Sequence, residues 1–554
     1  MGSVDEISSA VNKLTIALEN GEGKYTLGMN VLSAEPWVWT ITWNHRRKVC
    51  AACFTIPSNI RRTNGPDLRA CESCKTYAYC NTECQKMGWT SGHFMECELM
   101  RNMALHLEKK GLLVMDQDKS EMSYSTSMVY YVTSLVAKAL NRLHSDEGTT
   151  RSSEVDDKTA RDFYENVNDA PPINLSQSER TLIKELLQAA FDVATVTDIL
   201  PEAELWKYYC RTRSNISQMV DKTSHLPYGI GLYFENGAMR RCCDNNVVQT
   251  FKGKTMVMKA TKDLTLSSEL RSPGLVQDLQ PLPRKLRQRY YLAIYGKECD
   301  CRKCSDEYEA EINPMKCVTS GCNEVIPTDL RALQPCRKCG VKSDEERLLQ
   351  ARKTYEEFIR RYAETCDLNA QVSKSHKALA RREAPLGLLR QLDTNELVHP
   401  ENFLRYCCLY VLGITYYKIA TNIVPDTASC FAYREAWKHL KPLTELMGKF
   451  ECKYDQRALR ILKDAGVAAM YSATAQLEEA VAVFKGPRTK ETLPKSKGVR
   501  DASAVMEQGP RLLAIMAERH VALYGRSVPP VKPGKDRKGA SKNRLRAVKG
   551  GRVK

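Results

Sequence analysis

The sequence lacks the segments that mark secreted, lipid-anchored and membrane-spanning proteins. Residues 1–6 have no apolar targeting core and no serine or threonine at the sixth position, so they predict neither a signal peptide nor N-myristoylation. One apolar run, residues 406–424, approaches membrane length but contains Lys418 and Asn422. Because it lies among amphipathic helical patterns, a buried bundle helix explains it better than a membrane span does. We therefore expect no membrane partner.

Motifs of several common enzyme classes are also missing. The sequence has no GxSxG nucleophile elbow. Gly253-Lys254-Thr255 resembles the end of a phosphate-binding loop, but Val248 stands where that loop requires glycine. Of the nine histidines, only His93 has a spacing that suggests a chemical role. Cysteine is therefore the residue type that carries the strongest chemical signal.

Cysteine and positive charge are what the sequence has in abundance. The chain of 554 residues, long enough for several domains, contains 22 cysteines, many of them in close pairs. Such pairs without a signal peptide indicate thiolates on metal in a reducing environment rather than disulfides. The net charge is +17, and residues 526–554 carry +10 of it, from eleven Lys or Arg and one Asp.

The basic segment at residues 526–554 predicts a disordered tail, because it is rich in Gly and Pro and has almost no apolar residues to bury. Such a tail can bind nucleic acid through phosphate contacts, direct nuclear import, or only keep the protein in solution. The sequence leaves these three roles open. We expect a location in both nucleus and cytoplasm, with nucleic acid among the candidate partners.

Residues 50–97 hold seven cysteines and one histidine in four close pairs. These residues are Cys50, Cys53, Cys71, Cys74, Cys80, Cys84, His93 and Cys97. Zinc takes four ligands in a tetrahedron, and a short pair lets one turn of backbone supply two of them. Eight ligands therefore predict two structural zinc ions. A segment this short usually needs metal to fold, so metal binding and folding would be one equilibrium.

A second cysteine-rich segment follows at residues 299–339. Cys299, Cys301 and Cys304 offer three thiols, and a structural zinc needs a fourth ligand. Two cysteines earlier in the chain, Cys242 and Cys243, are the candidates for it. A further set could bind one more zinc, although ordinary buried or surface cysteines are the alternative interpretation. This set is Cys317, Cys322, Cys336 and Cys339.

The rest of the sequence combines strand and helix patterns. Apolar residues alternate in residues 29–43 and again in residues 228–266, which predicts strands. Residues 98–200 have mainly helical patterns, interrupted by a polar loop at 145–180. Amphipathic helices fill residues 341–525 without a clear repeat signature. The fold class we predict is α+β.

The sequence resembles the SET-and-MYND family of protein-lysine methyltransferases. The text YCNTECQKMGWTSGHFMEC resembles a MYND finger, and GIGLYFENGAMRRCCDNNVVQTF with the later RQRYYLAIYGKECDCRKC resembles SET and post-SET segments. The resemblance implies a β-rich SET core split by the finger, followed by a cysteine-rich post-SET segment and a TPR-like helical domain. The implied segments are 1–49 (N-terminal part of SET), 50–97 (finger), 98–200 (helical insert with polar loop), 201–298 (SET core), 299–340 (post-SET zinc-binding segment), 341–525 (TPR-like helices) and 526–554 (basic tail).

The resemblance also implies how the ligands share their metals. In MYND fingers the first and third pairs hold one zinc, and the second and fourth pairs hold the other. One zinc would then bind Cys50, Cys53, Cys80 and Cys84, and the other Cys71, Cys74, His93 and Cys97. On the family pattern, Cys243 matches the last residue of the NHSC motif and would complete a third zinc site with Cys299, Cys301 and Cys304.

The motifs that the family uses for methyl transfer from S-adenosylmethionine are altered in this chain. The NHSC motif reads Arg240-Arg241-Cys242-Cys243, which removes a hydrogen-bond acceptor and adds a cation near the sulfonium of the cofactor. The GEEL motif reads SSEL at residues 267–270. The tyrosine expected after it falls at Gly274, in the text RSPGL, which we predict to be a loop.

Two more elements of the family site differ. Lys297 stands where an aromatic residue is expected before the zinc cysteines, and residues 11–17 replace the glycine-bearing cofactor loop. Gly28 fits a turn before a strand better than it fits that loop. Asn215 matches an asparagine that contacts the cofactor in the family, although a loop asparagine that satisfies turn backbone is the alternative.

These substitutions predict a zinc-binding SET-and-MYND protein that is weak or inactive in methyl transfer and acts through protein interactions. No catalytic residue is predicted, and S-adenosylmethionine is doubtful as a cofactor. The alternatives are an active lysine (histone) methyltransferase with a differently built site, and a chromatin- or nucleic-acid-associated protein that acts through its tail. MYND fingers recognise proline-containing peptides, and Arg240 and Arg241 would attract acidic ones, so proteins or peptides are the expected partners.

Overall fold

The computed structural model describes most of the chain. The described residues are 24–56, 68–113, 124–144, 163–164, 175–221, 227–235, 239–265, 270–274, 282–371, 374–422, 427–450, 456–485 and 495–524. Three predictions concern residues outside these ranges: the basic tail at 526–554, the cofactor-loop position at 11–17, and residues 267–269 of the SSEL text. Most of the predicted polar loop at 145–180 also lies outside them, and its end is wrong, because residues 177–180 already form the first turn of a helix.

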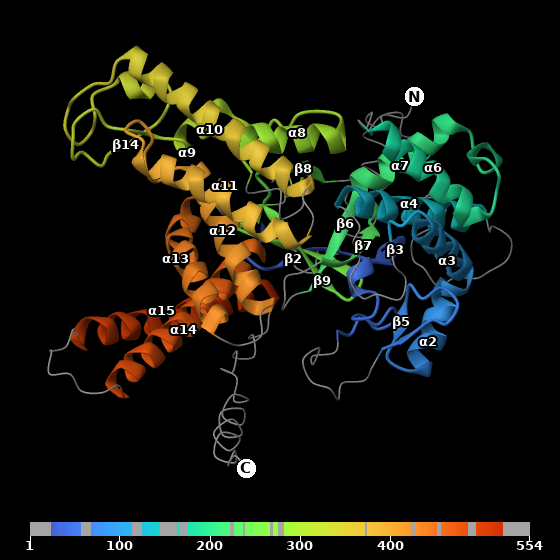
Figure 1. The fold of residues 1–554 in the computed structure, drawn as a ribbon. Coiled ribbons are helices and arrows are strands. Elements are labelled where there is room, and N and C mark those ends of the chain that lie inside the picture. Colours follow the sequence, from blue (N-terminus) through green and yellow to red (C-terminus); the bar gives the residue numbers. More distant parts are fainter. Residues whose placement is uncertain are drawn as a thin grey trace, which may run out of the picture.

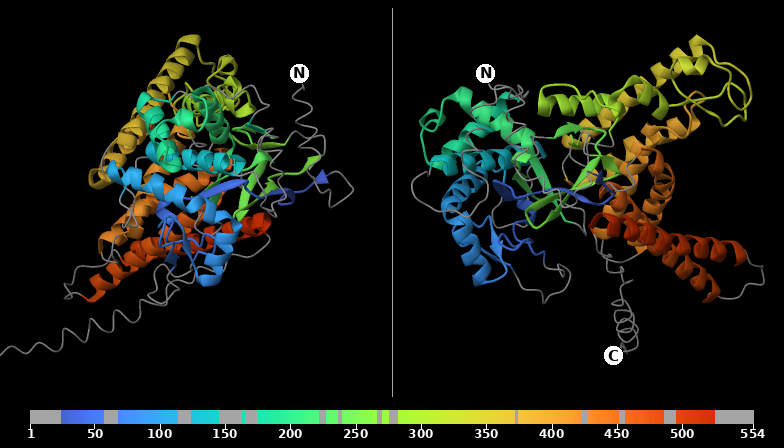
Figure 2. Two further views of the ribbon diagram at one scale, coloured as in Figure 1. Left: turned by 90° about the vertical axis from the view of Figure 1, so that its right-hand side faces the viewer. Right: turned by 180° about the vertical axis from the view of Figure 1, so that it is seen from behind.

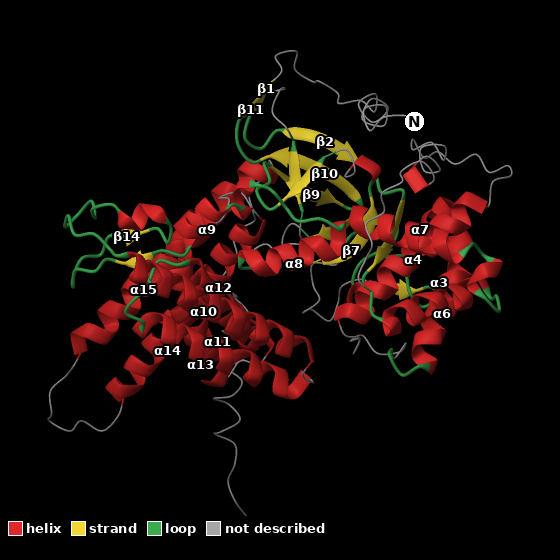
Figure 3. Cartoon of the chain, turned by 90° about the horizontal axis from the view of Figure 1, so that it is seen from above, coloured by secondary structure: helices red, strands yellow, loops and turns green. Residues whose placement is uncertain are grey.

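Two groups of helices lie on either side of the two three-stranded β-sheets (Figures 1 and 3). The first group comprises α2 (Thr82–Gly88), α3 (Phe94–Lys109), α4 (Tyr124–His144), α6 (Gln177–Phe191) and α7 (Glu202–Asn215). The second comprises α10 (Glu345–Gln371), α11 (Lys374–Thr394), α12 (Phe403–Asn422), α13 (Thr427–Phe450), α14 (Gln456–Lys485) and α15 (Lys495–Tyr524). Between them in the sequence come α8 (Arg284–Tyr295) and α9 (Asp306–Ile312). Short helical turns are η1 (Trp43–His45), η2 (Trp89–His93), η3 (Val196–Asp198), η5 (Arg302–Cys304) and η6 (Leu330–Leu333).

The sheets are small and mostly antiparallel. One three-stranded sheet has the order β2-β10-β9, formed by Asn30–Ala34, Thr255–Ala260 and Val247–Lys252. The other has the order β3-β7-β6, formed by Val38–Ile41, Pro227–Leu232 and Ile216–Val220. The two-stranded pairs are β1 (Lys24–Tyr25) with β11 (Leu264–Thr265), β4 (Arg69–Ala70) with β5 (Ala78–Tyr79), β12 (Arg271–Pro273) with β8 (Arg240–Cys242), and β13 (Met315–Lys316) with β14 (Val325–Ile326).

The β-core is assembled from both sides of the first metal segment. Strands β2 and β3 precede residue 50, whereas their partners β10 and β7 follow residue 226. Ala34 lies opposite Met256, and Val38 lies opposite Leu232. Seen from behind, these strands lie between the two helix groups (Figure 2, right). This arrangement confirms the predicted α+β fold with a split β-rich core and a helical C-terminal region.

Two glycines sit at turns that require a positive φ. Gly28 has φ 83° and precedes β2, and its N–H donates to the carbonyl of Ala260 at 2.9 Å. Gly253 has φ 63° and lies in the tight turn between β9 and β10, where such backbone matches the twist of a hairpin. The prediction that Gly28 belongs to a turn before a strand is therefore confirmed.

The predicted loop in the text RSPGL is wrong at its start. Arg271–Pro273 forms β12, which pairs in parallel with β8 (Arg240–Cys242). The backbone N–H of Arg271 donates to Asn246 Oδ1 at 2.7 Å, and the N–H of Gly274 donates to the carbonyl of Cys242 at 2.9 Å. Long-range pairing has overridden the local turn preference of Ser-Pro-Gly.

Local sequence explains where several helices begin. Ser176 and Glu179 form a capping box at the start of α6, because the Ser hydroxyl accepts the Glu N–H and the Glu carboxylate accepts the Ser N–H. Helix α12 is the apolar run considered above, and residues such as Tyr406 and Leu412 are fully buried in the second helix group. Among the described residues, no helix combines the length and apolar character that crossing a bilayer requires.

The last two helices approach each other closely at small residues. A Cβ placed on Gly466 of α14 would lie 3.1 Å from the carbonyl oxygen of Gly509 on α15, and one on Gly509 would lie 2.7 Å from Met470 Cγ. Any larger side chain would therefore separate the two helices. The helical character predicted for residues 341–525 is confirmed over the described part of this range.

Lys138 of α4 ties the first metal segment to the β-core. Its side chain is fully buried, with Nζ 2.8 Å from Glu96 Oε2. It also donates to the carbonyl of Trp39 on β3 at 2.7 Å and to the hydroxyl of Tyr77. A buried ammonium is tolerated only when it is paired and hydrogen-bonded, and all three partners belong to different segments.

We predict that Lys138→Met lowers the free energy of unfolding by about 3 kcal/mol, because the partly buried Glu96 would lose its cation and the carbonyl of Trp39 and the hydroxyl of Tyr77 would lose their donor. Urea unfolding followed by tryptophan fluorescence measures this change. Lys86→Met is the matched control, since Lys86 is 3.7 Å from Glu83 with both side chains exposed, and its effect should stay within about 0.5 kcal/mol. Equal stability of the two variants would contradict the prediction.

Candidate metal centres

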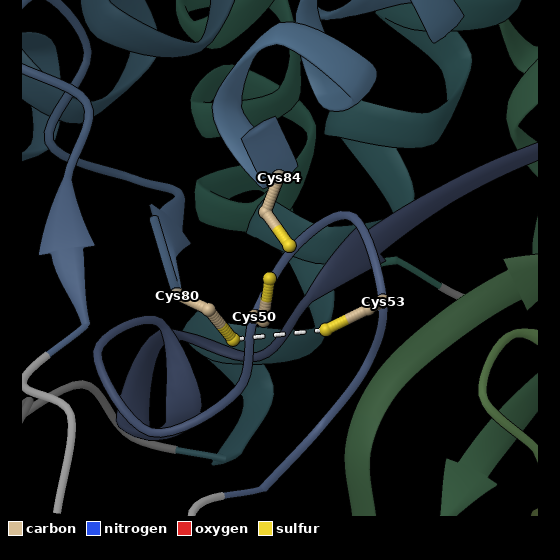
Figure 4. Close-up of side chains that lie close together, drawn as sticks. All are labelled: Cys50, Cys53, Cys80 and Cys84. Atoms are coloured by element: carbon tan, nitrogen blue, oxygen red, sulfur yellow. Dashed lines mark hydrogen bonds between the residues drawn. The ribbon is translucent and has the colours of Figure 1, made fainter. Parts of the chain in front are cut away.

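Cys50, Cys53, Cys80 and Cys84 converge on one point (Figure 4). Their sulfur atoms all lie within 4.8 Å of one another, and the Cys53 and Cys80 sulfurs are 3.7 Å apart. Zinc–sulfur bonds of about 2.3 Å give a tetrahedron with edges of about 3.8 Å, so the set has the spacing of a zinc site. Asn81 fixes Cys84 by accepting its N–H at 2.9 Å at the start of α2.

A second set consists of Cys71, Cys74, His93 and Cys97, all of them buried. The Cys71 and Cys97 sulfurs are 3.7 Å apart, and Cys74 Sγ is 3.6 Å from His93 Nε2. The hydroxyl of Thr76 donates to Cys74 Sγ at 3.1 Å, which favours the thiolate form that a metal needs. The structure thus brings together the two ligand sets that the family resemblance implied.

Each of the two sets contains a backbone turn of the same kind. The N–H of Phe54 donates to the carbonyl of Cys50 at 2.9 Å, and the N–H of Lys75 donates to that of Cys71 at 2.9 Å. Phe54 and Lys75 both have φ 56°, which is unfavourable for a side chain other than glycine. This turn, which we call the knuckle turn, brings the two cysteines of a Cys-x2-Cys pair together. The backbone strain at Phe54 and Lys75 has to be offset, and binding of a metal ion by the cysteines would do this.

A third set joins distant parts of the chain. Cys243, which follows β8, meets Cys299, Cys301 and Cys304 with all four sulfurs within 4.8 Å. Of the two candidates for the fourth ligand, Cys243 is therefore the one placed with the triplet, and Cys242 packs in the same buried cluster.

Gln288 of α8 positions Cys299. It donates to the carbonyl of Cys299 at 2.7 Å and accepts the N–H of the same residue at 2.7 Å.

A fourth set brings together Cys317, Cys322, Cys336 and Cys339, again with all sulfurs within 4.8 Å. The Cys317 and Cys339 sulfurs are 3.4 Å apart, and those of Cys322 and Cys336 are 3.8 Å apart. These distances are far longer than the disulfide bond of about 2.05 Å. All four sets therefore have the composition and spacing of zinc sites.

Hydrogen bonds favour the thiolate form of two ligands that are not fully buried, Cys339 and Cys53. The hydroxyl of Thr319 and the backbone of Val341 lower the pKa of Cys339 to about 6. Partial burial opposes ionisation of Cys53, yet its hydrogen bonds with Thr55 lower the pKa of this thiol to about 7. Metal ligands must be deprotonated, so these contacts favour metal binding near neutral pH.

Arg240 and Arg241, at the altered NHSC motif, contact other parts of the same fold. Arg240 Nη2 is 2.5 Å from Asp300 Oδ1, and this hydrogen bond holds the pKa of Asp300 below its usual value. Arg241 Nη1 donates to the Tyr295 hydroxyl at 3.2 Å, and its guanidinium lies 5.7 Å from the ring centroid. Arg240 and Arg241, which we predicted to attract acidic ligands, thus both contact residues of this chain near the third set.

Gly274, at the position of the expected tyrosine, has no room for a side chain. A Cβ there would lie 2.7 Å from Tyr291 Cε2 and 3.0 Å from the backbone nitrogen of Cys242. Tyr291 comes from α8, donates to the carbonyl of Arg241 at 2.5 Å and packs on Tyr295 with ring centroids 4.5 Å apart. An aromatic ring from another element therefore packs directly against this position.

Asn215 ends α7, directly before β6. Its Nδ2 donates to the carbonyl of Arg211 at 2.9 Å and lies 3.1 Å from Ser214 Oγ. The side chain is half-buried, and its donor group is directed to its own helix. Lys297 is exposed just after α8, where Gly296 ends the helix with φ 67°.

Comparison with known proteins agrees with this geometry. A family model for the MYND finger matches residues 50–97. Human histone-lysine N-methyltransferase SMYD3 is 20% identical over 287 residues, covering 50% of this chain and 57% of its own length. N-lysine methyltransferase SMYD2 of Gallus gallus is 23% identical over 286 residues, covering 51% and 56%. A SET and MYND domain-containing protein of Dictyostelium discoideum is 28% identical over 89 residues, 16% of this chain and 15% of that protein.

The chain contains a MYND finger and is similar to SET-and-MYND methyltransferases over about half of its length. The match spans just over half the length of human SMYD3 and of SMYD2 from Gallus gallus. Within this family frame, the first two sets belong to the MYND finger, and the third lies where the post-SET zinc site is expected. Only the first eight ligands fall inside the matched finger.

Sequence reasoning missed the residues that support these SET-and-MYND metal sites. Asn81, Thr76, Gln288 and Asn246 each hold a ligand or a strand next to one, as described above. Gln288 and Asn246 act on residues 11 and 25 positions further along the chain, separations for which no spacing rule exists. The role of Asn81 could have been predicted, because an asparagine before Thr82-Glu83-Cys84 is typical of a helix N-cap.

Arg287 of α8 neutralises charge at the third set. It is 3% exposed and donates to the carbonyls of Leu282 and Lys303, each at 2.7 Å. Its Nη2 also lies 3.9 Å from Cys304 Sγ. Four thiolates outweigh the charge of one Zn²⁺, so a buried guanidinium in contact with one of them favours the loaded state.

We predict that Arg287→Met speeds the release of zinc from the third set by about 10–100-fold, the usual cost of losing a residue that supports a metal ligand. Chelator competition on the full-length protein, followed by the colour of a zinc indicator, measures the rates. Arg284→Met on the same helix is the control, since Arg284 pairs with the exposed Asp306. Release at the same rate in both variants would contradict this role of Arg287.

Proposed function

We propose that this protein is a zinc-organised interaction protein whose SET domain transfers methyl groups weakly or not at all. One observation carries the proposal: two of the altered motif positions, Arg240 and Gly274, are engaged in contacts within the fold. Arg240 is paired with Asp300, and Gly274 packs against Tyr291. In the family these positions carry an asparagine and a tyrosine that serve methyl transfer.

The chemistry of these residues supports weak activity. Methyl transfer needs a bound cofactor, an oriented deprotonated amine and the exclusion of water. An arginine cannot accept a hydrogen bond or lose its charge, so it fits poorly beside the sulfonium of S-adenosylmethionine. Gly274 has no side-chain hydroxyl that could orient the substrate lysine. Loss of one positioned group commonly costs about 10²–10⁴ in rate, and here two are replaced.

We predict that calorimetric titration with S-adenosylmethionine detects no binding tighter than about 100 µM, a free energy of roughly −5.5 kcal/mol. Radiolabel from the donor should not pass to histone or peptide above the level of a boiled control. Human SMYD3 serves as the positive control under the same conditions. Micromolar binding that Asn215→Ala abolishes would support the alternative, an active lysine methyltransferase with a differently built site.

The finger offers a surface suited to peptide binding. Met87, Trp89 and Phe94 are exposed by 52%, 47% and 44%, and they lie close together in sequence at the end of α2 and in η2 and α3. The ring of Trp89 packs edge-on against His93 at 5.7 Å, so a residue of the second metal set orients it. Exposed aromatic side chains form the grooves that bind extended proline-rich peptides. We therefore place the proposed proline-containing partners here.

We predict that Trp89→Ala weakens binding of a labelled proline-rich peptide about 30-fold, the effect of losing a central aromatic contact. Fluorescence anisotropy measures the affinity, and zinc content checks that the finger stays loaded. Phe431→Ala is the matched control, since Phe431 is 56% exposed on α13. Unchanged affinity in the Trp89 variant with full zinc content would exclude this surface.

A further inference from the structure

The fourth cysteine set, outside the finger, contains the same knuckle turn. The N–H of Gly340 donates to the carbonyl of Cys336 at 2.8 Å, as Phe54 and Lys75 do in the two finger turns. Gly340 has φ 77°, the same left-handed backbone as those two residues. The N–H of Cys336 also donates to the carbonyl of Val341 at 3.0 Å, which closes the turn. In the matched finger this turn presents two metal ligands.

The other two cysteines of the set face this turn from a loop. Cys317 directly follows strand β13, and Cys322 follows Gly321, which has φ 77°. The N–H of Cys322 donates to the carbonyl of Thr319 at 3.1 Å, so the loop doubles back. Each loop cysteine then lies against one cysteine of the turn, with sulfur separations of 3.4 and 3.8 Å. These separations match the edges of about 3.8 Å expected around one zinc ion.

We propose that Cys317, Cys322, Cys336 and Cys339 bind one Zn²⁺ ion. Four thiolates in a tetrahedral arrangement favour zinc over harder divalent cations. The segment also places positive charge next to the ligands, which offsets the excess negative charge of a four-thiolate site. The basic residues are Lys316, Arg337, Lys338 and Lys342. This inference does not depend on whether the SET domain transfers methyl groups.

The segment around this set has little else to hold it together. Its buried core consists of Met315, Ile326, Ala332, Leu348 and Ala351 together with Cys317 and Cys336. Its only regular strands are the two-residue pair β13 and β14. So small a core rarely folds without a metal or disulfide. The zinc ion therefore supplies the stability of this segment.

The same segment fixes the start of the second helix group. The carbonyl of Pro314 accepts the N–H of His399 at 3.0 Å and the hydroxyl of Tyr355 at 2.6 Å. The N–H of Lys316 donates to the carbonyl of Leu397 at 2.8 Å. Pro314 and strand β13 thereby hold α10 and the turn between α11 and α12. Loading of the fourth set should thus order this turn as well as the cysteines.

Native mass spectrometry of the full-length protein tests the site. We expect four zinc ions in the wild type, three in Cys339→Ala and three in Cys322→Ala. Cys407→Ala, which changes a cysteine of α12 outside all four sets, should keep four. Three zinc ions in the wild type, with no loss in Cys339→Ala, would overturn the proposal. Iron in place of zinc would overturn the choice of metal, and the wild-type count holds even if a variant fails to fold.

Hydrogen exchange tests the consequence for the helices. The amides of Lys316 and His399 should exchange at least about tenfold faster in Cys339→Ala than in the wild type, because the metal no longer orders β13. Amides of α4, in the other helix group, should be unchanged. Loss of one zinc without faster exchange at Lys316 and His399 would leave the metal site in place but overturn its role in holding the turn.

Discussion

The structure depends on thiolates gathered where a divalent cation can neutralise them. Each of the four sets gathers ligands from separate turns, and the third joins Cys243 to a triplet that follows α8. Without a cation, such clusters would place several sulfurs of like charge, most of them buried, within 4.8 Å of one another. The strained residues Phe54 and Lys75 follow from the same constraint, because the knuckle turn that brings two cysteines together forces the next residue into left-handed backbone.

The altered methyl-transfer motifs lie directly against one of these sets. Arg240 pairs with Asp300, which stands between two ligands of the third set, and Arg241 contacts Tyr295 of α8. Tyr291 packs beside Gly274 and bonds to the backbone of Arg241. Arg240, Arg241 and Gly274 therefore all contact the segment that carries the third set.

The short spacings between cysteines and between apolar residues made much of the fold and of the metal sites predictable from the sequence. Four close pairs in residues 50–97 identified the ligands of the finger, and alternating or helical apolar patterns identified the strands and the C-terminal helices. The choice between Cys242 and Cys243 needed the family pattern, since the two cysteines are adjacent in the sequence. The strand at Arg271–Pro273 and the Arg240–Asp300 pair arise only from long-range contacts, for which a single sequence carries no signal.

The split β-core has a consequence for synthesis of the protein on the ribosome. Strands β2 and β3 leave the exit tunnel early, but their partners β10 and β7 follow only after the finger and the helices α3 to α7 have been made. The finger can close around its ions during this interval, whereas two apolar strand edges stay unpaired. Nascent chains with such edges are prone to aggregate and are typical clients of chaperones. Rapid capture of metal by the finger would shorten the search by holding the waiting strands near the place where their partners arrive.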